Sequence, residues 1–249
     1  MMVSETDERE AVARHDALSM HASALDAMSL ASNYHEWILD TVLPFIGSRV
    51  VEVGGGIGSI AHALQDRERL VVLDSDPVCC LRLHDRFDAR ENIRVIEGDI
   101  LDPGVVADLA TERLTTVVCV NVLEHIAEDK RALQSMYDLL QPGGHLVLFV
   151  PALPLIYGAL DTELGHVRRY RRRALRDTIT GVGFSVERCR FFNSIGAISW
   201  FAVGRVRRQQ VIHADQIRLY DRFFVPVLSR VERVIPPPFG QSLVISARK

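Results

Sequence analysis

Val50-Val51-Glu52-Val53-Gly54-Gly55-Gly56-Ile57-Gly58-Ser59 is the stretch that decides the fold. Apolar, β-branched residues fill its first four positions apart from Glu52, and this pattern predicts a short buried strand. The glycines predict a tight turn, because glycine adopts positive φ without strain and lets a ligand approach the backbone. Residues 59–64, Ser-Ile-Ala-His-Ala-Leu, predict the start of a helix. A strand, a glycine turn and a helix in this order predict a ligand-binding loop.

Strands and helices are expected to alternate from this stretch to residue 150. We expect strands at 50–53, 70–74, 93–97, 116–121 and 145–150, separated by helices at 59–67, 77–87, 103–110 and 128–140. Alternation with short connections predicts right-handed crossovers and a parallel sheet that is covered by helices on both faces. Two further strand-like stretches, 184–192 and 243–247, would complete a seven-stranded sheet.

Polar residues stand at or near the carboxyl ends of four successive expected strands. They are Glu52, Asp74, Asp99 and Asn121, at separations of 22, 25 and 22 residues, or about one strand–helix unit each. Any one of them could simply cap the helix that follows. Four in register beside a glycine turn favour a binding site, because ligands of open α/β sheets bind outside the carboxyl ends of the strands.

The first candidate ligand for this site is a dinucleotide, whose fingerprint is Gly-x-Gly-x-x-Gly. Gly54 and Gly56 match its first two glycines, but Ser59 stands at the third. The Glu52 carboxylate would also repel a pyrophosphate in the turn. S-adenosylmethionine fits better, because it is cationic and has no phosphate. Its ribose hydroxyls could bind Asp74, and its adenine amino group could donate to Asp99.

The same residues resemble the glycine motif of the Rossmann-like, class I S-adenosylmethionine-dependent methyltransferases. The resemblance continues through Leu73-Asp74, Gly98-Asp99-Ile100, Asn121-Val122-Leu123-Glu124-His125-Ile126 and Leu140-Gln141-Pro142-Gly143-Gly144. It implies an α/β, Rossmann-like fold with a mostly parallel seven-stranded sheet and an antiparallel last strand. It also implies S-adenosylmethionine as the cofactor and S-adenosylhomocysteine as the product.

The resemblance implies a role for each motif. The glycines would line the methionine part of the cofactor, Asp74 would bind the ribose, Asp99 and Ile100 would hold the adenine, and Asn121 with the following backbone would close the methionine side. The expected cofactor-binding residues are Tyr34, Glu52, Gly54, Gly55, Gly56, Gly58, Asp74, Ser75, Asp99, Ile100, Asn121, Val122 and Leu123. No metal is implied, because the acids are spread along the rim rather than clustered as ligands.

Three further segments narrow the resemblance to one subgroup. Residues 33–37, 161–170 and 238–243 resemble bacterial methyltransferases that act on small molecules or glycoconjugates. The expected function is therefore methyl transfer to an oxygen, nitrogen or carbon nucleophile of a small molecule. Two alternatives stay open, namely a nicotinamide-dependent oxidoreductase and a non-catalytic partner protein that binds S-adenosylmethionine.

The stretch from Ala152 to Tyr170 has loop character and follows the fifth strand, where the resemblance places the acceptor. His166 is the first candidate for a general base, since histidine titrates near neutral pH, and His125 and Tyr157 are the other catalytic candidates. Alternatively, His166 and Asp161 tie the loop together by hydrogen bonds. His125 could face the cofactor or cap a helix.

A basic cluster follows this loop and consists of Arg168, Arg169, Arg171, Arg172 and Arg173. A solvated helix start is the favoured interpretation. The alternative is recognition of an anionic group on the acceptor by arginine. Nucleic acid is not an expected partner, because the net charge is −3 and the basic patch is confined to one short segment. The motif at the end of the fourth expected strand is Asn-Val-Leu-Glu. It differs from the Asn/Asp-Pro-Pro-Tyr/Phe motif of methyltransferases that act on base amino groups, so base methylation is not expected.

The 249 residues are expected to form a single domain over 21–249 after a flexible, acidic stretch at 1–20. Residues 21–47 would form a helical lid and residues 194–237 a helical insertion before the last strand. The insertion has apolar faces that favour a roof over the acceptor pocket, with a homodimer seam or membrane contact as the alternatives. Four cysteines are too few for a disulfide framework, so we expect reduced thiols and a cytoplasmic location.

Overall fold

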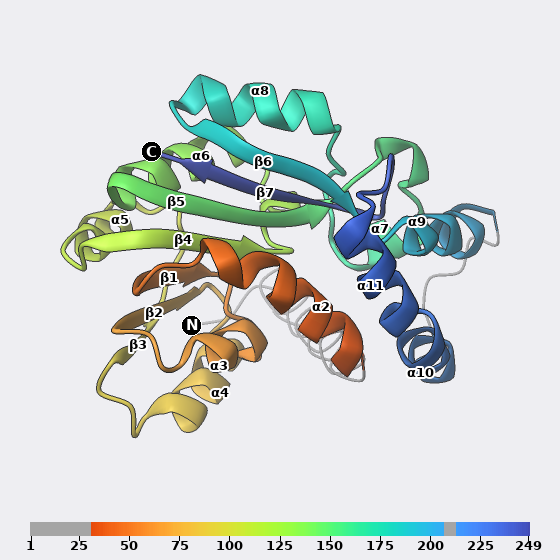
Figure 1. The fold of residues 1–249 in the computed structure, drawn as a ribbon. Coiled ribbons are helices and arrows are strands. Elements are labelled where there is room, and N and C mark those ends of the chain that lie inside the picture. The colour runs from red at the N-terminus through yellow and green to blue at the C-terminus, as the bar shows by residue number, and fades with distance from the viewer. Residues whose placement is uncertain (1–30, 207–212) are drawn as a thin grey trace, which may run out of the picture.

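The computed structural model describes residues 31–206 and 213–249, and these residues form a seven-stranded sheet (Figure 1). In space the strands follow the order β3-β2-β1-β4-β5-β7-β6. Their bounds are β1 Arg49–Val53, β2 Arg69–Asp74, β3 Ile93–Glu97, β4 Leu114–Val120, β5 Leu140–Pro151, β6 Ser185–Phe192 and β7 Ser242–Arg248.

The strand directions confirm the expected fold class. Strands β3, β2, β1, β4 and β5 pair in parallel, and β7 inserts antiparallel between β5 and β6. Every strand that the sequence predicted is present, although β5 begins at Leu140, five residues earlier than expected. The chain therefore has the Rossmann-like α/β sheet with an antiparallel last strand.

Helices cover both faces of this sheet (Figure 1). One face packs against α5 Pro103–Ala110, α6 Asp129–Leu139 and α8 Arg172–Val182, and the other packs against α2 Ser32–Val42, α3 Ser59–Leu64 and α4 Pro77–Phe87. Side chains of the inner strands alternate between the two cores, as period-2 geometry requires. Val51 and Val53 of β1 belong to the first core and Val50 to the second.

Two of the covering helices begin with the same capping arrangement. The side chain of Asp76 accepts a hydrogen bond from Val78 N at the start of α4, and Asp102 does the same for Gly104 N at the start of α5. A proline follows each aspartate at the first helical position, where its missing N–H costs nothing. Each aspartate and proline therefore fixes where a helix starts and, with it, where the preceding loop must end.

A group of helices lies beyond the carboxyl ends of the parallel strands (Figure 1). It consists of α7 Ala159–Glu163, α9 Ser194–Trp200, the π-helical segment η4 Phe201–Val206, α10 Ala214–Phe223 and α11 Val225–Val234. The sequence predicted two helices in the insertion 194–237, and the structure has α9 with η4 and then the α10–α11 pair. The segment 152–170, expected as loop, contains the short helix α7 and the 3-10 turn η3 Pro154–Ile156.

Two buried acids fix the helices of this group, one by binding α2 and the other by joining α11 to the start of α9. Asp221 of α10 accepts hydrogen bonds from the backbone N–H groups of Asn33 and Tyr34 at the start of α2. Glu232 of α11 accepts from the N–H groups of Asn193 and Ser194 at the start of α9, both at 2.8 Å. These carboxylates thus satisfy backbone donors that a helix cannot satisfy by itself.

The expected lid at 21–47 is represented by α2 and the 3-10 turn η1 Leu43–Phe45. Its first ten residues, and the stretch 1–20 for which flexibility was predicted, lie outside the described residues.

Several apolar side chains of the helical group are exposed, among them Leu219, Phe223, Val227 and Val231. No helix among the described residues has the length and apolar character that crossing a membrane requires. All four cysteines are buried free thiols.

Candidate active site

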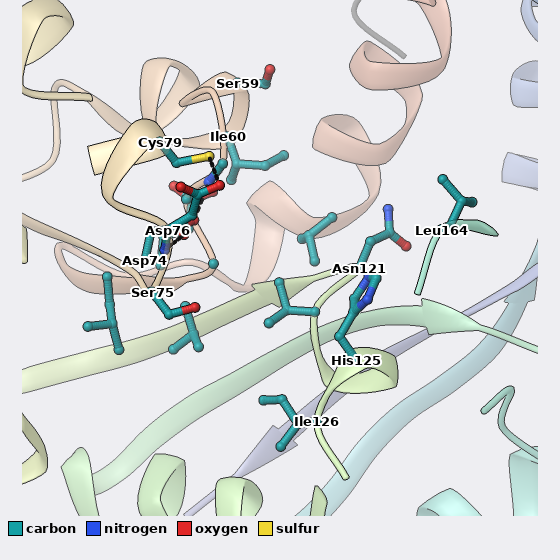
Figure 2. A pocket seen from close by; sticks show the side chains of 18 of the residues that line it. Ser59, Ile60, Asp74, Ser75, Asp76, Cys79, Asn121, His125, Ile126 and Leu164 are labelled. Atoms are coloured by element: carbon teal, nitrogen blue, oxygen red, sulfur yellow. Dashed lines mark hydrogen bonds between the residues drawn. The ribbon is translucent and has the colours of Figure 1, made fainter. Parts of the chain in front are cut away.

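A cavity of about 670 Å³ lies at the carboxyl ends of the parallel strands, between the glycine turn and the helical group. It brings together most of the residues that the sequence singled out. Those that line it are Tyr34, Glu52, Gly54, Gly55, Gly56, Asp74, Ser75, Asp99, Ile100, Asn121, Val122, His125 and His166. Figure 2 shows Asp74 and Ser75 on one side and Asn121 and His125 on the other.

Three of the predicted residues are outside the lining that the described residues give this cavity. Gly58 begins α3 with a φ of +80°, and Leu123 is fully buried in the core. The Tyr157 hydroxyl donates a 2.7 Å hydrogen bond to the backbone oxygen of His166, so it holds the loop. None of these three residues lines the cavity, so their predicted roles at the ligand have no support from its lining.

The glycine turn depends on backbone conformations that other residues adopt only with strain. Gly54 has a φ of +79° and Gly56 a φ of +51°. A Cβ at Gly54 would also lie 2.2 Å from Cγ2 of Val122, in the loop after β4. The first glycine is therefore required both by the turn and by the close packing of two strand ends.

Replacing Gly54 with alanine is expected to lower the free energy of unfolding by about 2 kcal/mol, because left-handed backbone alone costs an alanine about 1–2 kcal/mol and Val122 must also move. Denaturant unfolding measures this change. Gly181→Ala is the matched control, since Gly181 is exposed in α8 and no described atom lies within 4 Å of the added Cβ. An equal effect of the two variants on the free energy of unfolding would contradict the conclusion that the turn requires glycine at position 54.

Glu52 is buried, with 2% of its surface exposed, yet it stands beside the turn. Its Oε2 has no hydrogen-bond partner in the part of the chain that the structure describes. Burial, reinforced by the neighbouring Asp74 charge, raises the pKa of Glu52 well above its ordinary value. An unpaired buried carboxylate is costly unless a cation or a donor reaches it. This site therefore fits a ligand with a positively charged donor.

Asp74 supports the turn from the end of β2. Its Oδ2 accepts a 2.7 Å hydrogen bond from Gly56 N, and its Oδ1 accepts a 2.9 Å bond from Asp76 N. Asp99, after β3, accepts from Leu101 N at 2.8 Å. Each carboxylate is thus fixed by backbone donors while remaining in the cavity lining, and a carboxylate oxygen can accept further hydrogen bonds from ligand hydroxyl or amino groups.

The opposite side of the cavity is built on one buried aspartate, Asp161 of α7. Its Oδ1 lies 3.0 Å from His166 Nδ1 and 2.6 Å from Arg169 Nε, and its Oδ2 accepts from Trp200 Nε1 at 3.1 Å. Burial by itself opposes ionisation, but the hydrogen bond from His166 and the Arg169 charge hold the pKa of Asp161 below its usual value. His166 therefore has the contact with Asp161 that the loop-holding alternative expected, and because it also lines the cavity, its role as a base stays a prediction.

Glu124 and His125 follow the fourth strand in the 3-10 turn η2 Leu123–His125. Glu124 is fully buried, and burial raises the pKa of its carboxyl to about 8. The His125 ring faces the cavity in Figure 2, with Nδ1 3.2 Å from the carbonyl oxygen of Gly165 and its centroid 4.9 Å from that of His166. His125 therefore lines the cavity, and its role toward the cofactor stays a prediction.

Several residues that line the cavity were not predicted from the sequence. Arg169 was assigned to a solvated cluster, but its guanidinium is buried against Asp161 and 4.9 Å from the Trp200 ring. Arg168 pairs with Asp129 at 2.7 Å, and exposed Arg171, Arg172 and Arg173 begin α8 as predicted. The remaining missed lining residues include His35, Ile38, Ser59, Ile60, Asp76, Cys79, Leu164, Trp200, Gln241 and Ser242.

A family model described as a methyltransferase domain matches residues 27–188, which is more than half of the chain. A probable ribosomal RNA small subunit methyltransferase A of Methanosarcina mazei is 45% identical over 53 residues, covering 21% of this chain and 20% of that protein. The ornithine lipid N-methyltransferase of Singulisphaera acidiphila is 34% identical over 90 residues, covering 33% and 45%. The chain thus spans less than half the length of either relative.

Among solved structures, a SAM-dependent methyltransferase from Archaeoglobus fulgidus superposes with a TM-score of 0.57 at 17% identity, over 85% of this chain and 91% of that one. At this identity the likeness concerns the fold alone. This likeness in fold agrees with the match to the family model. The chain belongs to the methyltransferase domain family, and it has the fold of an S-adenosylmethionine-dependent methyltransferase.

Proposed function

We propose that this chain transfers a methyl group from S-adenosylmethionine to an oxygen, nitrogen or carbon nucleophile of a small molecule, such as a natural product or a glycoconjugate. The observation that carries the proposal is the buried Glu52 carboxylate beside the glycine turn, whose Oε2 meets no donor among residues 31–206 and 213–249. The ammonium group of the cofactor would supply that donor, whereas a pyrophosphate would be repelled.

The other lining residues suit the rest of the same cofactor. Asp74 would accept the ribose hydroxyls, and Asp99 with Ile100 would hold the adenine. Tyr34 and Asn121, with the backbone at Val122, would close the methionine side. When bound, the cofactor supplies the electrophilic methyl group. The chain's own part is to orient that group and to keep water away from it.

The acceptor would enter from the side of α7 and α9, where His166 and Trp200 line the cavity. A hydrogen bond to Asp161 holds His166 with Nδ1 as the donor, so Nε2 has the lone pair that accepts a proton from the acceptor. In the transfer, the new bond to the methyl carbon forms as the carbon–sulfur bond breaks, and the acceptor proton passes to Nε2.

A small acceptor is favoured over RNA, although several relatives are named as ribosomal RNA methyltransferases. Their matches cover only 53 to 58 residues, and the net charge of the chain is −3. Of the five clustered arginines only Arg169 lines the cavity, and its charge is paired with Asp161. The cluster therefore gives little support to the recognition of an anionic acceptor.

Binding of S-adenosylmethionine is expected to release a proton, because an ammonium beside Glu52 lowers the pKa that burial has raised. Release occurs at any pH between the pKa of Glu52 in the bound protein and its pKa in the free protein. Calorimetry at a series of pH values, each in buffers of different ionisation enthalpy, measures it. Glu52→Gln is expected to bind without proton release, and equal release by this variant would contradict the role of Glu52.

The transfer itself is tested by incubating the full chain with S-adenosylmethionine and a panel of hydroxyl, amine and carbon-acid metabolites. Mass spectrometry is expected to find one added methyl group on an acceptor, with an equal amount of S-adenosylhomocysteine. Tight binding of S-adenosylmethionine without transfer to any acceptor would favour the non-catalytic alternative. Binding of a nicotinamide dinucleotide in its place would favour the oxidoreductase.

A further inference from the structure

Three side chains that can ligate metals meet at the acceptor end of the cavity. Glu124, His125 and His166 each bring one ligand atom to this place, and these atoms all lie within 4.8 Å of one another. Oε1 of Glu124 is 3.9 Å from Nε2 of His166. Two atoms that each lie about 2.1 Å from one ion are at most about 4.2 Å apart, so this pair already has a suitable separation.

Glu124 is the most deeply buried member of the group. It is 0% exposed, and neither of its carboxylate oxygens has a hydrogen-bond partner within the described part of the chain. Placing a carboxylate in such surroundings costs several kcal/mol unless another charge compensates it. Arg169, the nearby buried cation, makes its ion pair with Asp161, and its charge acts on Glu124 without a hydrogen bond between the two.

The two histidines have the support that metal-binding histidines usually have. Nδ1 of His166 lies 3.0 Å from Oδ1 of Asp161, and Nδ1 of His125 lies 3.2 Å from the carbonyl oxygen of Gly165. A carboxylate or carbonyl at one ring nitrogen fixes the proton there and directs the lone pair of the other nitrogen to a metal. Asp161 is itself fixed by Arg169 and Trp200, so the outer support is rigid.

We propose that Glu124, His125 and His166 bind one divalent transition-metal ion beside the methyl-transfer site. Two imidazoles and one carboxylate suit Zn²⁺, Mn²⁺ or Fe²⁺ better than Mg²⁺, which prefers oxygen ligands. Three protein ligands leave coordination positions open. Since His125 and His166 line the cavity, these positions face the acceptor.

The consequence for the reaction rests on the function proposed above, and it narrows the acceptor to a hydroxyl compound. A hydroxyl group bound to the ion loses its proton to water more readily, because the cation stabilises the oxygen anion. That oxygen then forms the bond to the methyl carbon as the carbon–sulfur bond breaks. With the ion in place His166 is a ligand, and it no longer serves as the proton acceptor.

The test uses the full chain without an affinity tag, stripped with a chelator and dialysed. Titration with Zn²⁺ and with Mn²⁺ in a calorimeter is expected to show one site per chain. Glu124→Gln and His166→Gln are each expected to weaken it at least about 100-fold, since outer partners alone account for about 10–100-fold. His84→Gln is the matched control, because His84 is exposed on α4, and its affinity is expected to equal that of the original chain.

S-adenosylhomocysteine binding and thermal melting are measured on every variant, so that a folding defect is recognised. If the stripped chain binds neither ion, or if both variants bind as tightly as the control, the metal site is refuted while cofactor binding still supports the methyltransferase. If the ion binds as expected but no cofactor does, the proposed function fails and the metal site stands. Cobalt substitution adds a second readout, the visible absorption of a nitrogen-ligated Co²⁺, which both variants are expected to lose.

Discussion

Replacing Asp161 with alanine is expected to lower the free energy of unfolding by about 3–5 kcal/mol, the usual cost of leaving one partner of a buried ion pair alone. Arg169 would remain with 5% of its surface exposed and without its carboxylate, and the Trp200 indole and the Gly158 N–H would lose an acceptor. For a domain of this size the melting temperature would fall by roughly 6–20 °C. Thermal and denaturant unfolding in the presence of a chelator measure both quantities.

Glu163→Ala is the matched control for this variant. Glu163 lies two residues further along α7 and is exposed, so its removal is expected to change stability by less than about 0.5 kcal/mol. Asp161→Asn should fall between the two, because an amide oxygen still accepts from Gly158 but does not neutralise Arg169. If Asp161→Ala were no less stable than Glu163→Ala, the network around Asp161 would not hold the acceptor side together.

Replacing Asp74 with alanine is expected to weaken S-adenosylmethionine binding roughly 100- to 1000-fold. The carboxylate holds the N–H groups of Gly56 and Asp76 at 2.7 and 2.9 Å, and in the proposed complex it also accepts the ribose hydroxyls. Hydrogen bonds to a charged group contribute about 1.5–3 kcal/mol each, and about 1.4 kcal/mol corresponds to tenfold in affinity. Calorimetry with S-adenosylmethionine measures the loss.

Asp85→Ala removes the same charge from an exposed position on α4 and provides the control. Its affinity for S-adenosylmethionine is expected to match that of the original chain within about twofold, because exposed charges outside the site contribute little. Unchanged binding by Asp74→Ala would remove the ribose assignment. A loss as large in Asp85→Ala would show that net charge, rather than contact, governs binding.

Local pattern was enough to predict the sheet and the ligand side of the cavity. The β-branched run at 50–53 and the alternation to residue 150 depend on neighbours in sequence, because strand and helix periodicity repeat within a few residues. The rim followed from topology, since carboxyl ends of parallel strands meet at one edge. The sequence therefore predicts that four polar residues lie together, and all four line the cavity: Glu52, Asp74, Asp99 and Asn121.

The helical group shows which contacts a local sequence pattern cannot predict. Its apolar faces predicted helices, but nothing in the insertion indicated that Asp221 would cap α2, 188 residues away from Asn33. The same holds for Glu232 at the start of α9. An exposed acid and a buried capping acid have the same local sequence signature, because the donors they satisfy belong to another segment.

The sequence by itself determined the parallel sheet, the glycine turn and the acids at the carboxyl ends of the strands, because each follows from backbone geometry over a few residues. Only the tertiary structure decided the acceptor side, where α7, the loop after β4 and α9 meet. In the sequence, Arg169 is one of five clustered arginines, and only the structure shows that it pairs with Asp161. Glu124 is part of a sequence motif, and only the structure shows that its carboxylate oxygens are buried without a hydrogen-bond partner among the described residues. Pairing and desolvation are set by which segments pack together, and the hydrogen bonds between Trp200 and Asp161 and between His125 and Gly165 join residues 39 and 40 positions apart.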